Sequence, residues 1–68
     1  MTNTKLLRDK IDSSGLKIGY IAEQINLTYQ GFLNKLNNET EFKASEIKML
    51  QSILGLTNKE RDAIFFYE

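Results

Sequence analysis

The stretch that decides the fold is residues 17–37, KIGYIAEQINLTYQGFLNKLN, where two apolar patterns of helical period are separated by a short polar break. Asn26 tolerates a positive φ better than most residues, and Thr28 is a favoured N-cap. We therefore predict two short helices, residues 17–25 and 28–37, joined by a tight turn, which is the pattern of a helix-turn-helix. The apolar positions are Ile18, Ile21, Ala22 and Ile25, followed by Phe32, Leu33 and Leu36.

A first helix is expected before this segment. It begins near residues 2–4, where a hydroxyl or amide side chain can cap it, and carries Leu6, Leu7 and Ile11 inward. Gly15 suits the left-handed residue that ends a helix. Ala22 is the small residue at which the third helix approaches the second.

Two more helices are expected after residue 44. Ser45 is the expected N-cap of the fourth helix, and Gly55 is its expected end. The sequence T-N-K-E at residues 57–60 fits a capping box, so a fifth helix starts there and ends in the apolar run at residues 63–67. Phe42, in the loop before the fourth helix, is expected to close the gap between flanking helices.

Length and composition restrict the class of protein. A chain of 68 residues is expected to form a single domain, residues 1–68, and 41% apolar residues without proline suit a compact all-α bundle. No cysteine or histidine is available, which disfavours an enzyme, a metal site or a bound cofactor. No apolar run is long enough to span a membrane, and the N-terminus does not resemble a secretory signal, so we expect a soluble intracellular protein.

The net charge is zero but unevenly distributed. Residues 1–35 contain five basic and three acidic residues, a net charge of +2, and residues 36–68 contain four basic and six acidic residues, a net charge of −2. Duplex DNA binding draws much of its affinity from neutralised phosphates, so this asymmetry predicts only weak non-specific attraction. An ordinary solvated surface explains the charges equally well.

The third helix would carry the contacts if this motif binds DNA, because such a helix lies in the major groove. Its amide side chains can pair with adenine, its tyrosine suits a thymine methyl or a phosphate, and its lysine suits a phosphate. The polar face of any amphipathic helix is the alternative explanation. The candidate residues are Thr28, Tyr29, Gln30, Asn34 and Lys35, with Lys17 at the start of the preceding helix. Gly19 and Gly31 depart from a purely DNA-binding pattern, since both expose backbone where side chains are expected.

The chain resembles the small Cro and repressor proteins of lambda-type phages, which belong to the broad Xre class. The resemblance covers roughly residues 5–66 and is carried by residues 17–38, by E-F-K-A-S-E-I at residues 41–47, and by I-L-G-L-T at residues 53–57. Ala22, Leu27 and Phe32 match internal contacts of that family.

This resemblance implies a five-helix, lambda repressor-like bundle that acts as a transcription regulator in the cytoplasm of a bacterial host. Asn26 departs from it, because the family usually has glycine there. Base contacts would then fall to Tyr29, Gln30 and Asn34.

Two functions remain open. The first is a Cro-type regulator that binds double-stranded operator DNA as a homodimer, with a dimer contact formed by Ile64, Phe65, Phe66 and Tyr67. Coverage of the first and fourth helices explains Phe65 or Phe66 equally well. The second is an anti-repressor or modulator that binds the partner phage repressor through the same fold and binds DNA weakly or not at all. Neutral charge, sparse lysines and the two glycines favour the second.

Overall fold

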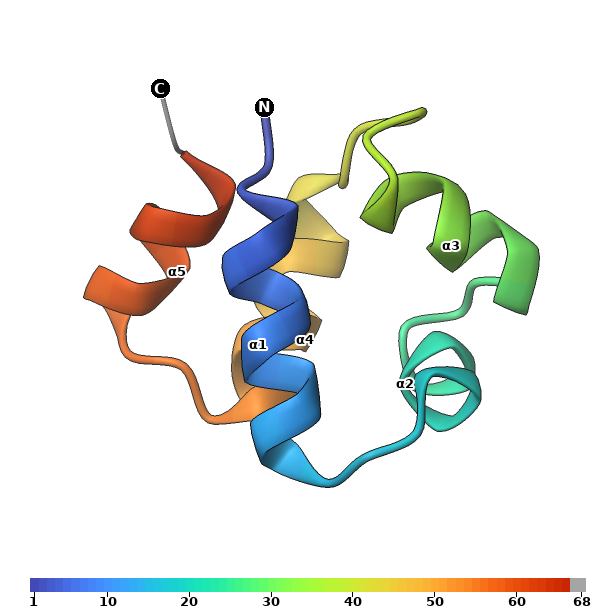
Figure 1. The fold of residues 1–68 in the computed structure, drawn as a ribbon, viewed down its shortest axis with the longest axis horizontal. Coiled ribbons are helices and arrows are strands. Elements are labelled where there is room, and N and C mark those ends of the chain that lie inside the picture. Colours follow the sequence, from blue (N-terminus) through green and yellow to red (C-terminus); the bar gives the residue numbers. More distant parts are fainter. Residues whose placement is uncertain (67–68) are drawn as a thin grey trace.

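Five helices make up the part of the chain that the computed structural model describes, residues 1–66 (Figure 1). They are α1 (Thr4–Ser14), α2 (Ile18–Gln24), α3 (Tyr29–Leu36), α4 (Ala44–Leu54) and α5 (Asn58–Phe65). Residues 1–66 contain no strand, so the all-α prediction is confirmed. None of the five helices is long and apolar enough to cross a membrane.

The ends of most helices follow the predicted capping chemistry. Asn3 caps α1 by accepting a hydrogen bond from the Leu6 N–H at 3.2 Å. Gly15 and Gly55 close α1 and α4 with positive φ values of 74° and 65°, which a side chain would strain. Asn26, in the turn between α2 and α3, has a φ of 61°, as its residue type predicts.

The capping box at the start of α5 is also confirmed. The Thr57 hydroxyl accepts from the Glu60 N–H at 3.1 Å, and the Glu60 carboxylate accepts from the Thr57 N–H at 2.8 Å. The ammonium of Lys10 on α1 donates to the same carboxylate. The Lys10 contact, followed by the Thr57 N–H, lowers the pKa of Glu60 to about 2.

The predicted cap of α4 is wrong. The helix begins one residue before Ser45, and its N-cap is Lys43, whose side chain makes no capping hydrogen bond. Glu46 supplies the cap instead, because its Oε1 accepts from the Lys43 N–H at 2.8 Å. Ser45 is therefore an exposed residue of the first turn.

Three phenylalanines join the helices at the centre of the molecule. Phe42 lies edge-on to Phe32 of α3 and to Phe65 of α5, with ring centroids 6.1 and 5.4 Å apart. The prediction that Phe42 fills the gap between flanking helices is thereby confirmed. Among the three rings Phe32 is fully buried, and the remaining fully buried large side chains are Leu7, Ile21, Ile25, Leu36, Leu50 and Ile64.

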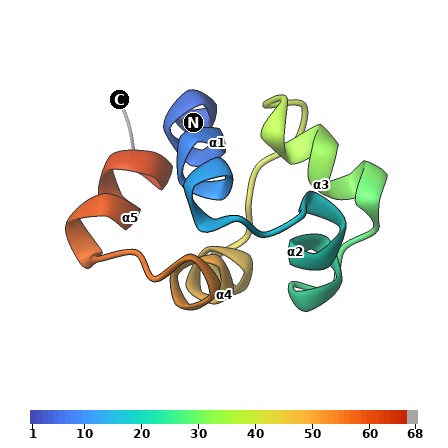
Figure 2. The same ribbon diagram turned by 60° about the horizontal axis from the view of Figure 1, so that its bottom comes forward.

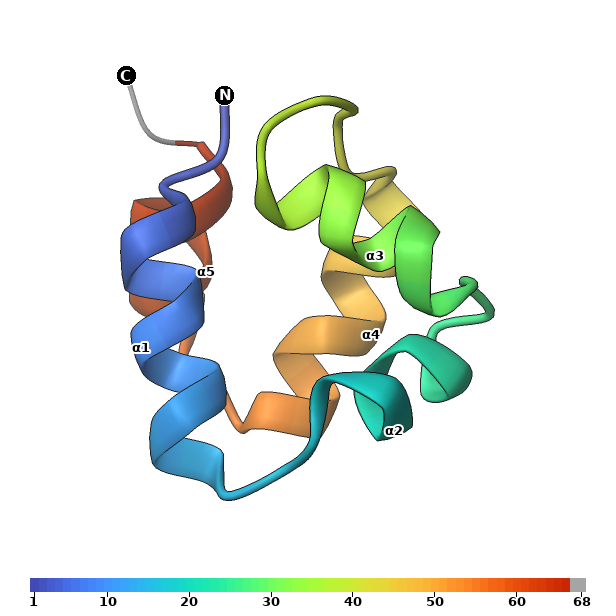
Figure 3. The same cartoon turned by 45° about the vertical axis from the view of Figure 1, so that its right-hand side comes forward.

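The helices place α5 and the α2–α3 pair on opposite sides of α1 and α4 (Figures 1 and 2). The view in Figure 3 gives the same order, with α1 and α5 on one side and α2 and α3 on the other. The N-terminal segment lies beside the end of α5, because the Asn3 N–H donates to the Ile64 carbonyl at 2.7 Å. This arrangement leaves the outer side of α3 uncovered.

Candidate nucleic-acid interface

The turn between α2 and α3 sets the angle at which α3 leaves the core. Ala22 is 2% exposed, and its carbonyl accepts from the Leu27 N–H at 2.9 Å. The small side chain lets α3 approach α2 closely, as expected. At the other end of α3, a guanidinium N–H of Arg8 on α1 donates to the Asn37 Oδ1 at 2.9 Å. Both ends of α3 are therefore anchored.

Thr28 caps α3 by accepting from the Gly31 N–H at 3.0 Å. A Cβ added at Gly31 would lie 2.9 Å from the Thr28 Oγ1 and would press against the capping hydroxyl. Gly31 thus has a local structural role, independent of any partner. The sequence pattern alone did not reveal this role.

The exposed side of α3 presents four predicted residues together: Thr28, Tyr29, Gln30 and Asn34. We call this surface the α3 face. Thr28, Tyr29 and Gln30 are exposed, and Asn34 is half-buried. The Gln30 Nε2 donates to the Asn34 Oδ1 at 2.9 Å, one turn apart on the helix.

That hydrogen bond orders the two amides. The Gln30 Oε1 is left as an acceptor, and the second N–H of the Gln30 Nε2 and both N–H groups of the Asn34 Nδ2 are left as donors. Adenine presents the complementary pair in the major groove, with N6–H as donor and N7 as acceptor. The α3 face therefore presents amide groups of the type that pairs with adenine.

Lys35 lies elsewhere than predicted, because its side chain is buried. The residue is 9% exposed, and its ammonium donates to the Glu41 carbonyl at 2.7 Å. The same ammonium lies 3.3 Å from the Glu46 carboxylate and 5.9 Å from the centre of the Phe42 ring. In this structure Lys35 is an internal cation, and it is not positioned to bind a phosphate.

The signal for this burial was the position of Lys35 on the helix. Lys35 follows the buried Phe32 by three residues and precedes the buried Leu36, so it borders the inward side of α3. At the edge of a buried helix side, the apolar stem of a lysine can pack against the core while its ammonium reaches a polar partner. Its partner Glu46, 5% exposed, was missed because the sequence spacing of eleven residues crosses a loop.

Lys17 is exposed at the N-cap of α2 and forms no ion pair within residues 1–66. Next to it, Gly19 leaves room beside α3, since an added Cβ would only touch the Tyr29 ring at 3.9 Å. Tyr20 and Tyr29 are 50% and 56% exposed. Two exposed tyrosines thus belong to the helix pair α2 and α3, and Lys17 is an exposed cation at the start of that pair.

The residues of the predicted dimer contact differ in their exposure. Ile64 and Phe65 are 0% and 6% exposed, so both belong to the core and neither offers a free surface. Phe66, at 61%, is exposed. Tyr67 lies outside the described residues.

Within residues 1–66, no group of three or more histidine, cysteine, aspartate or glutamate residues is placed to hold a metal ion. No family model, curated protein or solved structure matches this chain.

Proposed function

We propose that this protein is a DNA-binding transcription regulator of the Cro type, in which α2, the turn and α3 form a helix-turn-helix within a lambda repressor-like bundle. The observation that supports this most is the ordered pair Gln30–Asn34, exposed on a helix whose two ends are anchored. Its free acceptor and donors are the groups that can pair with adenine in the major groove. Such a regulator would act on double-stranded operator DNA in the cytoplasm of a bacterial host.

Each element has a defined role in this proposal. The α3 face contacts base edges, with Tyr29 placed to touch a thymine methyl or a phosphate. Lys17, at the start of α2, contacts a phosphate, because the first helix of such a motif crosses the DNA backbone. Lys35 stays inside the protein and acts on DNA only by holding α3 in place.

The test is selection of ligands from a randomised duplex library, followed by fluorescence anisotropy with the selected sequence between about 50 and 200 mM salt. Specific, salt-dependent binding is expected. Because the proposal assigns one lysine, Lys17, to a phosphate, the slope of log affinity against log salt should be shallow, about −1 per protein chain. The absence of any selected sequence would refute the proposal.

A second function is favoured by one specific observation. Tyr29 on the α3 face and Tyr20 on the preceding helix are both half-exposed, and tyrosine is enriched in protein interfaces. The same surface would then bind a phage repressor protein and mask its DNA-binding helix. Co-purification with the repressor encoded nearby, without any selected DNA ligand, would support this function over the first.

A further inference from the structure

An open groove lies between α4 and α5, and most of the surface that lines it is apolar. Its volume is about 540 Å³. Three large apolar side chains line it: Phe42 is buried, Ile47 is half-buried, and Phe66 is 61% exposed. No residue of the α3 face belongs to the lining, so the groove is a second, separate surface of the molecule.

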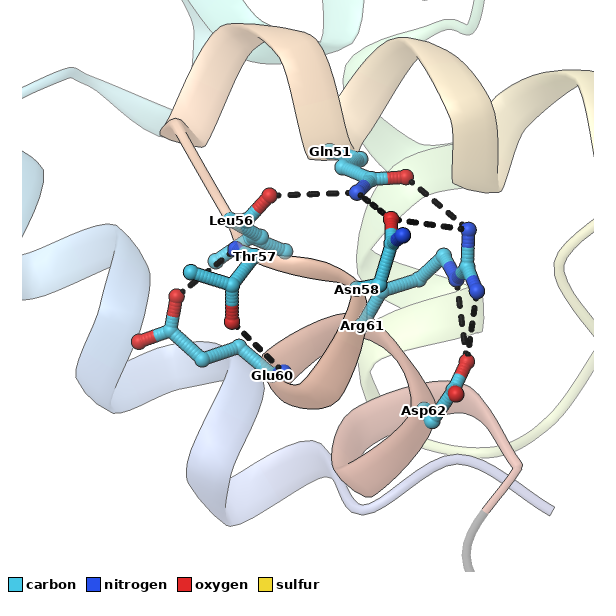
Figure 4. A network of polar contacts seen from close by, with 7 residues as sticks. All are labelled: Gln51, Leu56, Thr57, Asn58, Glu60, Arg61 and Asp62. Carbon is cyan, nitrogen blue, oxygen red and sulfur yellow. Dashed lines mark hydrogen bonds and ion pairs between the residues drawn. The ribbon is translucent and has the colours of Figure 1, made fainter.

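The polar side chains of the groove are Lys48, Gln51 and Arg61, and the amide of Gln51 is already engaged within the protein (Figure 4). The Gln51 Nε2 donates to the Leu56 carbonyl at 3.1 Å and to the Asn58 Oδ1 at 2.9 Å. The Gln51 Oε1 accepts from the Arg61 guanidinium at 3.3 Å. Both amide N–H groups are therefore used, and Gln51 holds α4 to α5 instead of offering a donor to an occupant.

The two charged side chains of the lining are both cations, and they differ in how far they are neutralised. The Arg61 guanidinium pairs with the Asp62 carboxylate at 2.9 Å. Lys48 is exposed and forms no ion pair within residues 1–66. No aspartate or glutamate of these residues belongs to the lining. The groove thus combines an apolar surface with one ammonium that lacks a counter-charge.

The open shape of the groove favours a protein segment over a small molecule. A small-molecule site buries about 70–90% of the surface of its ligand, whereas an open groove leaves one side of any occupant in water. An amphipathic helix meets this condition, because it buries one apolar stripe and keeps its polar side solvated. Insertion of such a helix into an apolar groove is a common mode of peptide recognition.

We propose that the groove binds an amphipathic helix of a partner protein, which packs apolar side chains on Phe42, Ile47 and Phe66 and pairs an acidic side chain with Lys48. Apolar residues three or four positions apart form the buried stripe of such a helix, and an acidic residue beside the stripe reaches the rim of the groove. Charge complementarity selects the acid, because a cation brought against Lys48 would repel it. The proposal does not depend on DNA binding, and the α3 face stays free while the groove is filled.

The test is a selection from a displayed library of random peptides of about 14 residues, or four helical turns, on the immobilised full chain. The enriched peptides should carry apolar residues at spacings of three or four and more Asp and Glu than Lys and Arg. Their affinities are then measured by fluorescence anisotropy. In ¹⁵N NMR spectra, the amide signals of Ile47 and Lys48 should move on binding, and those of Tyr29 and Gln30 should not.

Two substitutions with matched controls test the named contacts. Lys48→Glu reverses the charge of an exposed side chain and should weaken binding of the enriched peptides at least about tenfold. Its control, Lys59→Glu, makes the same change at an exposed residue of α5 outside the groove and should alter the affinity less than about twofold. Phe66→Ser should weaken binding at least about tenfold, whereas Tyr20→Ser, at an exposed aromatic residue of α2, should leave it unchanged.

A charge exchange separates a direct contact from damage to the fold. The enriched peptides are synthesised again with lysine in place of their acidic residues. Lys48→Glu should bind these basic peptides at least about tenfold more tightly than the acidic ones, and the wild type should show the opposite preference. A groove that was merely deformed by the substitution would not reverse its preference.

Three results would overturn the proposal: no enriched peptide, enriched peptides without an excess of acidic residues, or equal affinities of the wild type and Lys48→Glu. A second copy in the groove would overturn it equally, and sedimentation equilibrium would show it as a mass near twice 7.9 kDa that Phe66→Ser returns to 7.9 kDa. Failure of the proposed function is seen separately. Phe66→Ser should keep the wild-type affinity for a selected duplex, because it does not touch the α3 face.

Discussion

Removing the ammonium of Lys35 should destabilise the fold strongly, although replacing a surface lysine normally changes the free energy of unfolding little. In Lys35→Met the apolar stem keeps its packing, but the Glu46 carboxylate stays buried without its cation. Breaking a buried ion pair from one side costs about 3–5 kcal/mol. Glu46 retains the hydrogen bond from the Lys43 N–H, so we expect the lower end, about 3 kcal/mol.

A loss of this size is large for such a small domain. A chain of this length has a free energy of unfolding of about 3–10 kcal/mol. At about 4–8 °C per kcal/mol, the melting temperature should fall by about 12–24 °C. Urea unfolding followed by circular dichroism at neutral pH measures the effect, with Lys59→Met, at an exposed lysine of α5, as the matched control.

The double variant Lys35→Met/Glu46→Gln separates an unpaired charge from lost packing. The introduced amide would be uncharged, and its oxygen would still accept from the Lys43 N–H, so most of the stability should return. The DNA affinity of the double variant should show the wild-type salt slope, because Lys35 contacts no phosphate in the proposed complex. If Lys35→Met lost no more unfolding free energy than Lys59→Met, the buried ion pair would be refuted. If the salt slope of the double variant were smaller in magnitude than that of the wild type by about one, the internal role of Lys35 would be refuted.

Three further predictions follow from individual contacts. The pKa of Glu60 is lowered to about 2, so the contribution of its carboxylate to stability is complete above about pH 4.5 and is lost as the pH falls toward 2. In urea unfolding measured across that pH range, Glu60→Gln should lose less stability than the wild type. Equal losses would contradict the Lys10 contact. Gln30→Ala should alter the base preference found in a repeated selection. Lys17→Ala should lower the affinity for all duplexes alike and reduce the magnitude of the salt slope by about one. The reverse pattern would contradict the assigned roles. Phe42→Ala should cost about 3–5 kcal/mol in the free energy of unfolding, and a loss below about 1 kcal/mol would show that the three rings do not form a common core.

Local chemistry explains why much of the fold was predictable from the sequence. Gly15 and Gly55 end helices, and Thr57 with Glu60 starts one, because each acts within four residues of its own position. The apolar period placed Leu7 and Ile11 correctly for the same reason. Interactions of this range can be inferred from spacing alone.

The errors concern residues whose role depends on a distant partner. Ser45 is a better intrinsic N-cap than Lys43, yet α4 starts earlier because Glu46 accepts the Lys43 N–H while also facing Lys35 of α3. For Phe65 the sequence left a dimer contact and a place over the helices equally open; it lies in the core, where Phe42 packs against it from a loop. No local pattern indicates such pairings, which arise only when the helices are assembled.

The burial of Lys35 also changes what the proposed DNA complex requires. With this cation inside the protein, one chain offers little phosphate neutralisation, and affinity must come from base contacts on the α3 face. One neutral face of this size supplies few such contacts. A second copy doubles them and turns the second binding event into an intramolecular one, which raises affinity without any new kind of contact. If the protein binds DNA as the homodimer that its resemblance to Cro proteins implies, a weakly charged α3 face is the case in which pairing raises the affinity most.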